Sequence, residues 1–228
     1  MSDRFTSTEQ ETDQLTAEET LLRAFDQLQT NAAIASSFGA EDMVLIDMAN
    51  RLKLPFPVFT LDTDFLFVQT YNLISQAEQR YGIVVERLRS AFTPEEQARV
   101  YGDQLWASDP DKCCLLRKVE PLRRKLAGLG GWITGIRRDQ SPARAYTRKV
   151  EWDEKFGLVK FNPLADWNSE QIWNYLRTNR VPYNPLHDQN YPSIGCTHCT
   201  RPVKTGEDPR SGRWSGSNKT ECGLHIKE

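Results

Sequence analysis

The fold is decided by the stretch Ala32-Ala33-Ile34-Ala35-Ser36-Ser37-Phe38-Gly39-Ala40-Glu41-Asp42. A short apolar run ends here in a small, polar loop, and an amphipathic segment follows directly. A strand that passes through a glycine-containing loop into a helix is the first half of a β-α-β unit. The pattern therefore predicts a buried strand over 32–36 and a helix over 41–52.

The same alternation continues along the chain. Further β-type runs and amphipathic segments follow at 57–61, 65–80, 83–88 and 132–136. Strands that alternate with helices indicate an α/β fold, a mostly parallel twisted sheet with helices on both faces. A capping box at Thr16 and Glu19 predicts a helix over 17–29, and a last helix is expected over 168–180.

Three segments are expected. Residues 1–15 are polar and are predicted to be a mobile N-terminal segment, and 16–200 form the α/β domain. Residues 201–228 are rich in Pro, Gly, Ser and basic residues and are predicted to be a flexible C-terminal tail.

Composition limits the possible functions. The 228 residues are 39% hydrophobic and 26% charged, with a net charge of −2, which gives no overall reason to expect nucleic-acid or membrane binding. The start of the chain has no basic segment followed by an apolar one, so a cytoplasmic location is predicted. In a reducing compartment, grouped cysteines more often bind metal or act in catalysis than form disulfides.

Four of the five cysteines fall into two pairs, Cys113-Cys114 and Cys196-Thr197-His198-Cys199. Two pairs of thiolates suit Zn²⁺ or a [4Fe-4S] cluster, and CxxC spacing alone favours zinc. The adjacent pair favours the cluster, because it cannot easily close a disulfide but both thiols can face one inorganic group. Buried cysteines that act only as small hydrophobic residues are the remaining alternative.

The fifth cysteine, Cys222, stands alone near the C-terminus, with Arg210, Arg213 and Lys219 in the same segment. Nearby positive charge lowers the pKa of a thiol and raises its thiolate fraction. We therefore expect a reactive thiol, with a stray surface cysteine as the alternative.

Ligands of open α/β sheets bind beyond the carboxyl ends of the strands, which nominates three loops, 36–42, 61–64 and 134–144. The first loop could hold a phosphate through backbone N–H groups at a helix N-terminus, but it lacks the Gly-Lys-Ser/Thr of a Walker A loop. Glu41 and Asp42 are expected either to complement the helix dipole or to contact a ligand directly.

Basic residues are expected to hold the anionic part of a ligand. The third loop carries Arg137, Arg138 and Arg144 at a strand end, which suits a doubly anionic ligand. Lys118 follows Cys114 by four residues and would share its face on a helix, between metal site and ligand. A solvated basic loop and an ordinary exposed lysine are the alternatives.

Three motifs together resemble one family. They are Lys112-Cys113-Cys114 followed by Arg117-Lys118, then Cys196-Thr197-His198-Cys199-Thr200-Arg201-Pro202, and Glu221-Cys222-Gly223-Leu224-His225. They are similar to the thioredoxin-dependent adenylyl-sulfate (APS) reductases, and the resemblance runs from about residue 36 to 225. Relatives that reduce the 3′-phosphorylated substrate, PAPS, usually keep only the terminal cysteine.

The resemblance implies an adenine-nucleotide α-hydrolase-like fold, a [4Fe-4S] cluster on Cys113, Cys114, Cys196 and Cys199, and Cys222 as the nucleophile. The reductant would be thioredoxin or a glutaredoxin-like protein, and a homo-oligomer is one possible assembly. The substrate-binding residues implied are Ser37, Phe38, Gly39, Glu41, Asp42, Leu61, Thr63, Lys118, Gly135, Arg144, Arg210, Arg213 and His225. Of these, Lys118, Arg210, Arg213 and His225 would surround the sulfate.

Two positions depart from the family pattern. Asp64 replaces the glycine of a common Leu-Asp-Thr-Gly loop and adds a negative charge, and Ser36-Ser37-Phe38-Gly39 differs in order from Ser-Phe-Ser-Gly. Alternatives are PAPS as substrate, a tRNA-thiolation enzyme and a zinc-stapled binding module. The tRNA enzyme would require a Ser-Gly-Gly-x-Asp-Ser loop, and the zinc module leaves Cys222 unused.

Overall fold

Six strands form one sheet in the order β3-β2-β1-β4-β6-β5 in a computed structural model that describes residues 11–215, 219 and 221–225. The strands are β1 (Ala32–Ala35), β2 (Val58–Asp62), β3 (Val85–Arg89), β4 (Gly131–Ile133), β5 (Val150–Asp153) and β6 (Leu158–Phe161). All neighbouring strands are parallel except the β5/β6 pair. The predicted mostly parallel sheet is confirmed.

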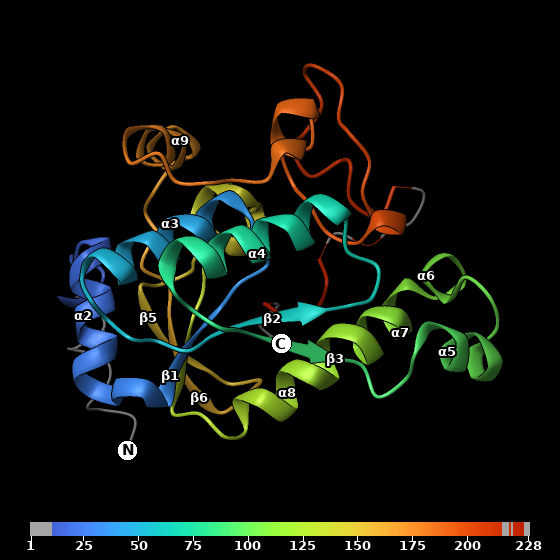
Figure 1. Ribbon diagram of the computed structural model, residues 1–228, viewed down its shortest axis with the longest axis horizontal. Helices are drawn as coiled ribbons and strands as arrows, with labels where there is room; N and C mark the ends of the chain where they lie inside the picture. Colours follow the sequence, from blue (N-terminus) through green and yellow to red (C-terminus); the bar gives the residue numbers. More distant parts are fainter. Residues whose placement is uncertain (1–10, 216–218, 220, 226–228) are drawn as a thin grey trace.

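Helices cover both faces of this sheet, as predicted (Figure 1). Side chains of a strand alternate between its two faces, so Ile34 packs into the main core and Ala33 into a second, smaller core. The helices of the main core are α2 (Ala17–Leu28), α3 (Ala40–Arg51), α4 (Val68–Tyr81) and α9 (Ser169–Thr178). The second core contains Leu122 and Leu126 of α8 (Glu120–Leu126) and is contacted by Leu224 from the tail.

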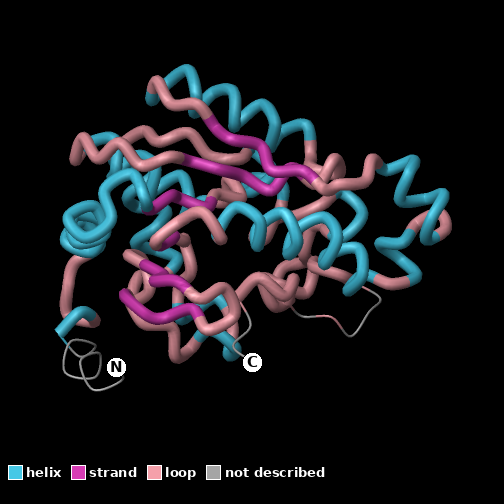
Figure 2. Tube along the Cα trace, turned by 90° about the horizontal axis from the view of Figure 1, so that it is seen from below, coloured by secondary structure: helices cyan, strands magenta, loops and turns pink. Residues whose placement is uncertain are grey.

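A helical extension lies beyond the edge of the sheet. It consists of α5 (Pro94–Tyr101), α6 (Leu105–Ser108) and α7 (Pro110–Cys114), and both views show α5 and α6 at one end of the molecule (Figures 1 and 2). A π-helical turn, Leu115–Val119, joins α7 to α8. This extension therefore carries the adjacent cysteines to the edge of the sheet.

Sequence patterns predicted both elements of the first two β-α repeats, and β3, to within a few residues, but several later elements were missed. The strand expected over 132–136 ends at Ile133. The β5/β6 hairpin was not predicted because Glu151, Asp153 and Lys160 interrupt its apolar pattern, although Gly157 at φ +69° marks the turn. Helix α5 was also missed, although Thr93 and Glu96 form a capping box at its start.

The topology places β1 at the centre of the ligand-binding edge. After β1 the chain moves outward through β2 and β3, then returns to the opposite side of β1 as β4. The loops after β1 and β4 consequently diverge and leave a crevice between them. This is the edge at which the sequence predicted a site.

The terminal segments are described only in part. Residues 1–10 lie outside the described residues, whereas Thr12 is buried and Asp13 accepts a hydrogen bond from the Lys149 backbone at 2.9 Å. Arg213 of the tail forms an isolated antiparallel bridge with Thr200. The mobility of both segments stays a prediction.

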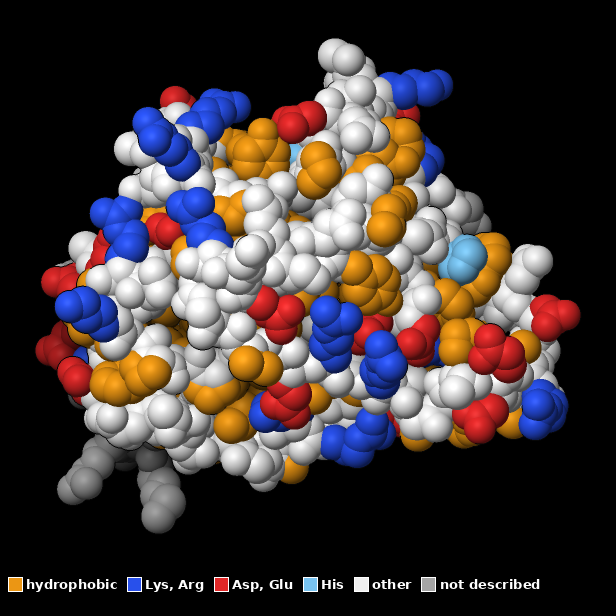
Figure 3. Space-filling model, viewed as in Figure 1, with side chains coloured by type: hydrophobic (Ala, Val, Ile, Leu, Met, Phe, Trp, Pro, Cys, Tyr) orange, Lys and Arg blue, Asp and Glu red, His pale blue; other side chains and the backbone are white. Residues whose placement is uncertain are grey.

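The surface carries mixed charges. On the face seen in Figure 3, acidic and basic side chains are interspersed over the helices. Among the described residues, no helix is long and apolar enough to cross a membrane.

Candidate active site

A cavity of about 730 Å³ lies at the strand ends where the sequence predicted it. The loops after β1, β2 and β4 line it, together with the tail. Of the predicted substrate-binding residues, it is lined by Ser37, Gly39, Glu41, Asp42, Leu61, Thr63, Lys118, Gly135, Arg144, Arg210, Arg213 and His225, and Cys222 joins them. Phe38 differs, because its side chain is 1% exposed in the main core and only its backbone belongs to the loop.

The loop after β1 is held by Asp42 from the first turn of α3. The Asp42 carboxylate accepts hydrogen bonds from the Ser37 backbone N–H at 2.6 Å and from the Ser37 hydroxyl at 2.8 Å. Burial raises the pKa of Asp42 to about 6 against the opposing effect of these bonds. Asp42 thus fixes the shape of the loop, and its Oδ2 atom is already hydrogen-bonded to Ser37.

The loop after β4 lies against the start of α3. A Cβ on Gly135 would lie 2.5 Å from an Asp42 oxygen, so only glycine permits this approach. Glu41 accepts hydrogen bonds from Arg137 at 2.9 Å and from Gln140 at 3.0 Å. Protein contacts therefore tie the two loops together.

All three arginines predicted to bind an anion have protein carboxylates as partners, and that of Arg144 is Glu221 at 2.9 Å. Arg137 pairs with Glu41 and Asp139, and Arg138 pairs with Asp13 at 3.1 Å. Both also line the large cavity, so their contact with an anionic ligand stays a prediction. Arg144 lines the cavity as well, and its buried Nε has no hydrogen-bond partner among the described residues.

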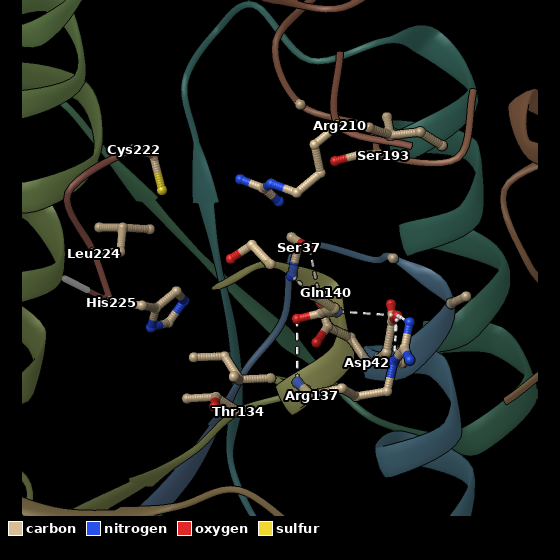
Figure 4. Close-up of a pocket in the computed structure, with 18 of the residues that line it drawn as sticks. Ser37, Asp42, Thr134, Arg137, Gln140, Ser193, Arg210, Cys222, Leu224 and His225 are labelled. Atoms are coloured by element: carbon tan, nitrogen blue, oxygen red, sulfur yellow. Dashed lines mark hydrogen bonds and ion pairs between the residues drawn. The ribbon is translucent and has the colours of Figure 1, made fainter. Parts of the chain in front are cut away.

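The tail closes one side of the cavity. Figure 4 shows the Cys222 thiol and the Arg210 guanidinium pointing into the cavity, with Leu224 and His225 beside Cys222 on the tail. The His225 ring stacks on Trp132 with 5.4 Å between ring centroids. Burial, with smaller effects of nearby cations, holds the pKa of His225 well below its usual value, so the ring is neutral near pH 7.

The loop after β2 connects the cavity to the cysteines. Asp64 has φ +60°, the left-handed conformation that glycine adopts most easily. Its carboxylate pairs with the buried Arg117 at 2.9 Å, and Arg117 also donates to the Thr63 carbonyl at 3.0 Å. The added charge of Asp64 is therefore compensated within the protein.

Four cysteines line a second, small cavity next to the first. They are Cys113, Cys114, Cys196 and Cys199. The hydroxyl of Thr63 lies 3.2 Å from the Cys196 sulfur, and the His198 ring stacks on Trp106 at 4.5 Å. The sequence prediction that these two pairs meet is consistent with this arrangement.

The adjacent cysteines end the α-helix α7, and a π-helical turn follows them directly. The Glu120 N–H donates to the Leu115 carbonyl five residues earlier, as in a π-helix, and such turns occur often at functional sites. Lys118 lines both cavities, between the cysteine pairs and Cys222. Burial alone would lower the pKa of Lys118, but Cys196, Cys114 and Cys222 raise it above its usual value, which keeps the amine charged.

The four thiols fit a group that binds thiolates. Burial raises the pKa of Cys113 to about 12 and that of Cys199 to about 11, with the neighbouring cysteines adding to both shifts. Such crowded thiols release their protons when a metal group binds. Within the described part of the chain, no three His, Cys, Asp or Glu side chains are arranged to hold a single metal ion.

Glu221 lines the large cavity and was not predicted as a site residue. It lies beside Cys222 and pairs with Arg144 and with Arg210, each at 2.9 Å. Trp132 and Gln140 also line the cavity. The only sequence signal for Glu221 was its place next to the isolated cysteine.

Most of the chain is similar to known proteins of one family. The phosphoadenosine phosphosulfate reductase domain family matches residues 31–202. Similar curated proteins include an adenosine 5′-phosphosulfate reductase of Halalkalibacterium halodurans, 53% identical over 84% of this chain and 83% of that protein. Adenosine 5′-phosphosulfate reductase 2 of Bacillus subtilis is 45% identical over 94% of this chain and 92% of its own.

Solved structures agree on the fold. The phosphoadenylyl-sulfate (PAPS) reductase of Candida auris has a TM-score of 0.77 and 31% identity, covering 88% of this chain and 98% of that one. A Candida glabrata FMN adenylyltransferase with ATP has a TM-score of 0.61 at 16% identity, covering 94% and 75%. With the domain match spanning most of its length, the chain belongs to the phosphoadenosine phosphosulfate reductase family.

Proposed function

We propose that the protein reduces adenosine 5′-phosphosulfate to sulfite and AMP, with Cys222 as the nucleophile. One observation carries the proposal: four cysteines line the small cavity, whereas Cys222 alone of the five lines the large cavity. The names of the similar curated proteins support APS as the substrate.

The cavity is suited to an adenine nucleotide. Ser37 and Gly39 lie at the N-terminal end of α3, where backbone N–H groups and the helix dipole favour a phosphate. Leu61 and Ile136 offer apolar surface for a base. Lys118, Arg210 and Arg213 would surround the sulfate.

The reaction needs a thiolate to approach an anion. In the proposed step, the Cys222 thiolate attacks the sulfur of the phosphosulfate, the bond from sulfur to the phosphate oxygen breaks, and AMP leaves with that electron pair. The product is an S-sulfonated Cys222. Lys118 and Arg210 lower the cost of bringing two negative groups together, since both line the cavity that Cys222 faces.

A dithiol protein completes the cycle. One thiolate of a thioredoxin or glutaredoxin-like reductant attacks the Cys222 sulfur, releases sulfite and forms a mixed disulfide. Its second thiol resolves that bond, so Cys222 returns as a thiol and the reductant leaves oxidised. Two electrons pass from reductant to sulfate sulfur, as the reaction requires.

Cys113, Cys114, Cys196 and Cys199 would hold a [4Fe-4S] cluster, whose bound charge would contribute electrostatically to the site. Lys118 lies between these cysteines and Cys222 and would stay protonated there. Thr63 would orient its hydroxyl toward Cys196 on the other side. We also propose a cytoplasmic role in sulfate assimilation that leads to cysteine.

The test is thioredoxin-coupled sulfite release from APS and from PAPS in parallel, on anaerobically purified protein whose iron and sulfide are measured. We expect turnover with APS on a four-iron protein. Turnover with PAPS alone would replace the proposed substrate. No sulfite from either, with zinc bound, would support the zinc-stapled binding module instead.

A further inference from the structure

Glu221 occupies two arginines of the cavity at once. One carboxylate oxygen lies 2.9 Å from Nη2 of Arg144 and 2.9 Å from Nη2 of Arg210, while the other accepts a hydrogen bond from the Ser141 hydroxyl at 3.3 Å. The Glu221 side chain is 7% exposed, and those of Arg144 and Arg210 are 12% and 18% exposed. Because water screens so buried a cluster poorly, its charges interact strongly.

The two arginines come from different parts of the fold. Arg144 belongs to the loop after β4, and Arg210 belongs to the tail segment that passes over the cavity. Glu221 immediately precedes Cys222 in the chain. The carboxylate thus ties the cysteine-bearing end of the tail to both walls of the cavity.

Other contacts hold the same end of the tail without a carboxylate. Lys155 donates a hydrogen bond to the Gly223 carbonyl at 2.9 Å, Leu224 packs against the second core, and His225 stacks on Trp132. Among these contacts of the tail end, the Glu221 carboxylate is the anionic group. An anionic ligand that binds these two guanidinium groups would therefore compete with the Glu221 carboxylate for them.

We propose that Glu221 is a positioning residue that docks Cys222 by acting as an internal counter-anion, and that the anionic end of a nucleotide competes with it for Arg144 and Arg210. Arrival of the ligand then weakens the ion pairs of Glu221 and leaves the contacts of Gly223, Leu224 and His225. The Glu221 carboxylate thus lowers the affinity of the cavity for the nucleotide and at the same time fixes the position of the Cys222 thiol. The role of Glu221 in turnover rests on the proposed function, whereas the competition between Glu221 and an anionic nucleotide does not.

Glu221→Gln keeps the size of the side chain and removes its charge. We expect AMP to bind at least about threefold more tightly to this variant, because the carboxylate no longer competes. Amide hydrogen exchange in the peptide containing residues 221–225 should become at least about threefold faster without nucleotide, because the docking is weaker. In turnover, KM for APS and kcat should both fall.

Two further variants sharpen the test. Glu221→Asp keeps the charge on a shorter side chain and should give intermediate values for AMP affinity and exchange. Glu207→Gln is the matched control, since Glu207 pairs with Arg201 at 3.0 Å in the same tail but does not line the cavity. It should match the wild-type protein in both measurements.

The outcomes separate the two proposals. If AMP binds the wild-type protein but Glu221→Gln leaves either its affinity or the exchange rate unchanged, the counter-anion role is overturned. If AMP does not bind the wild-type protein, the proposed nucleotide site fails first. Tighter AMP binding and faster exchange in Glu221→Gln, with Glu207→Gln unchanged, would establish the competition even in a protein that releases no sulfite.

Discussion

The large cavity and the four-cysteine cavity lie side by side, but the chain builds them differently. Most walls of the large cavity are loops that directly follow β1, β2 and β4, so regular strands fix their positions. The cysteine cavity joins a π-helical junction near Cys114 to an irregular segment at Cys196. Its assembly depends on contacts between residues about eighty positions apart in the chain.

The difference indicates which region depends on the other. The loops of the large cavity are held by the sheet and by short-range bonds such as Asp42 to Ser37. The CxxC segment is attached through the loop after β2, where the Thr197 N–H donates to the Phe65 carbonyl at 2.8 Å and Leu66 forms a bridge with Cys196. We therefore expect the large cavity to survive damage to the cysteine cavity.

The largest effect is expected from Cys222→Ser, which acts on the large cavity alone. Sulfite release should fall by at least about a thousandfold, because a hydroxyl is a far poorer nucleophile than a thiolate at neutral pH. Iron content and AMP affinity should match those of the wild-type protein. Turnover retained in this variant would remove Cys222 as the nucleophile.

Cys199→Ala acts on the other cavity. We expect bound iron to be lost and sulfite release to fall with it, while AMP affinity stays within about threefold of wild type, because the strand-end loops are built independently. Iron analysis and AMP titration on one sample measure both. Unchanged iron would contradict the ligand assignment, and lost AMP binding would contradict the independence of the two regions.

This contrast also explains how far the sequence could predict the molecule. The loop after β1 was predicted because the whole signal, strand, loop and helix, lies within about twenty residues. The cysteines were grouped by their chemistry, whereas the π-turn beside them has no such local signature. The ion pairs of Arg137 with Glu41 and of Arg144 with Glu221 were not predicted, because the partners are distant in sequence and only the folded chain brings them together.

Asp42→Asn tests the stability of the strand-end region. Because burial raises the pKa of Asp42 from 3.8 to about 6, the folded protein holds a proton that the unfolded chain releases between these values. The free energy of unfolding of wild type, relative to Asp42→Asn, should therefore decrease as pH rises from about 4 to 6, by at most about 3 kcal/mol. Urea unfolding from pH 4.5 to 7 measures this.

A matched control separates Asp42 from the other carboxylates. Asp26→Asn replaces an exposed carboxylate on α2 and should show no such pH-dependent difference. If the difference between wild type and Asp42→Asn is also constant over this pH range, Asp42 titrates at the same pH in the folded and unfolded chains, and burial does not govern its ionisation.

The smallest effect concerns Asp64, which links the two regions through Arg117. Asp64→Gly removes the ion pair but suits φ +60°, whereas Asp64→Ala removes the pair and must also adopt this left-handed conformation. We expect Asp64→Ala to be about 1 kcal/mol less stable than Asp64→Gly in urea unfolding. Asp64→Asn tolerates the conformation without the charge, so its difference from wild type measures the pair. Equal stability of the glycine and alanine variants would mean that the loop relaxes, and the connection between the cavities would then depend on Thr63 and Arg117 rather than on the conformation at Asp64.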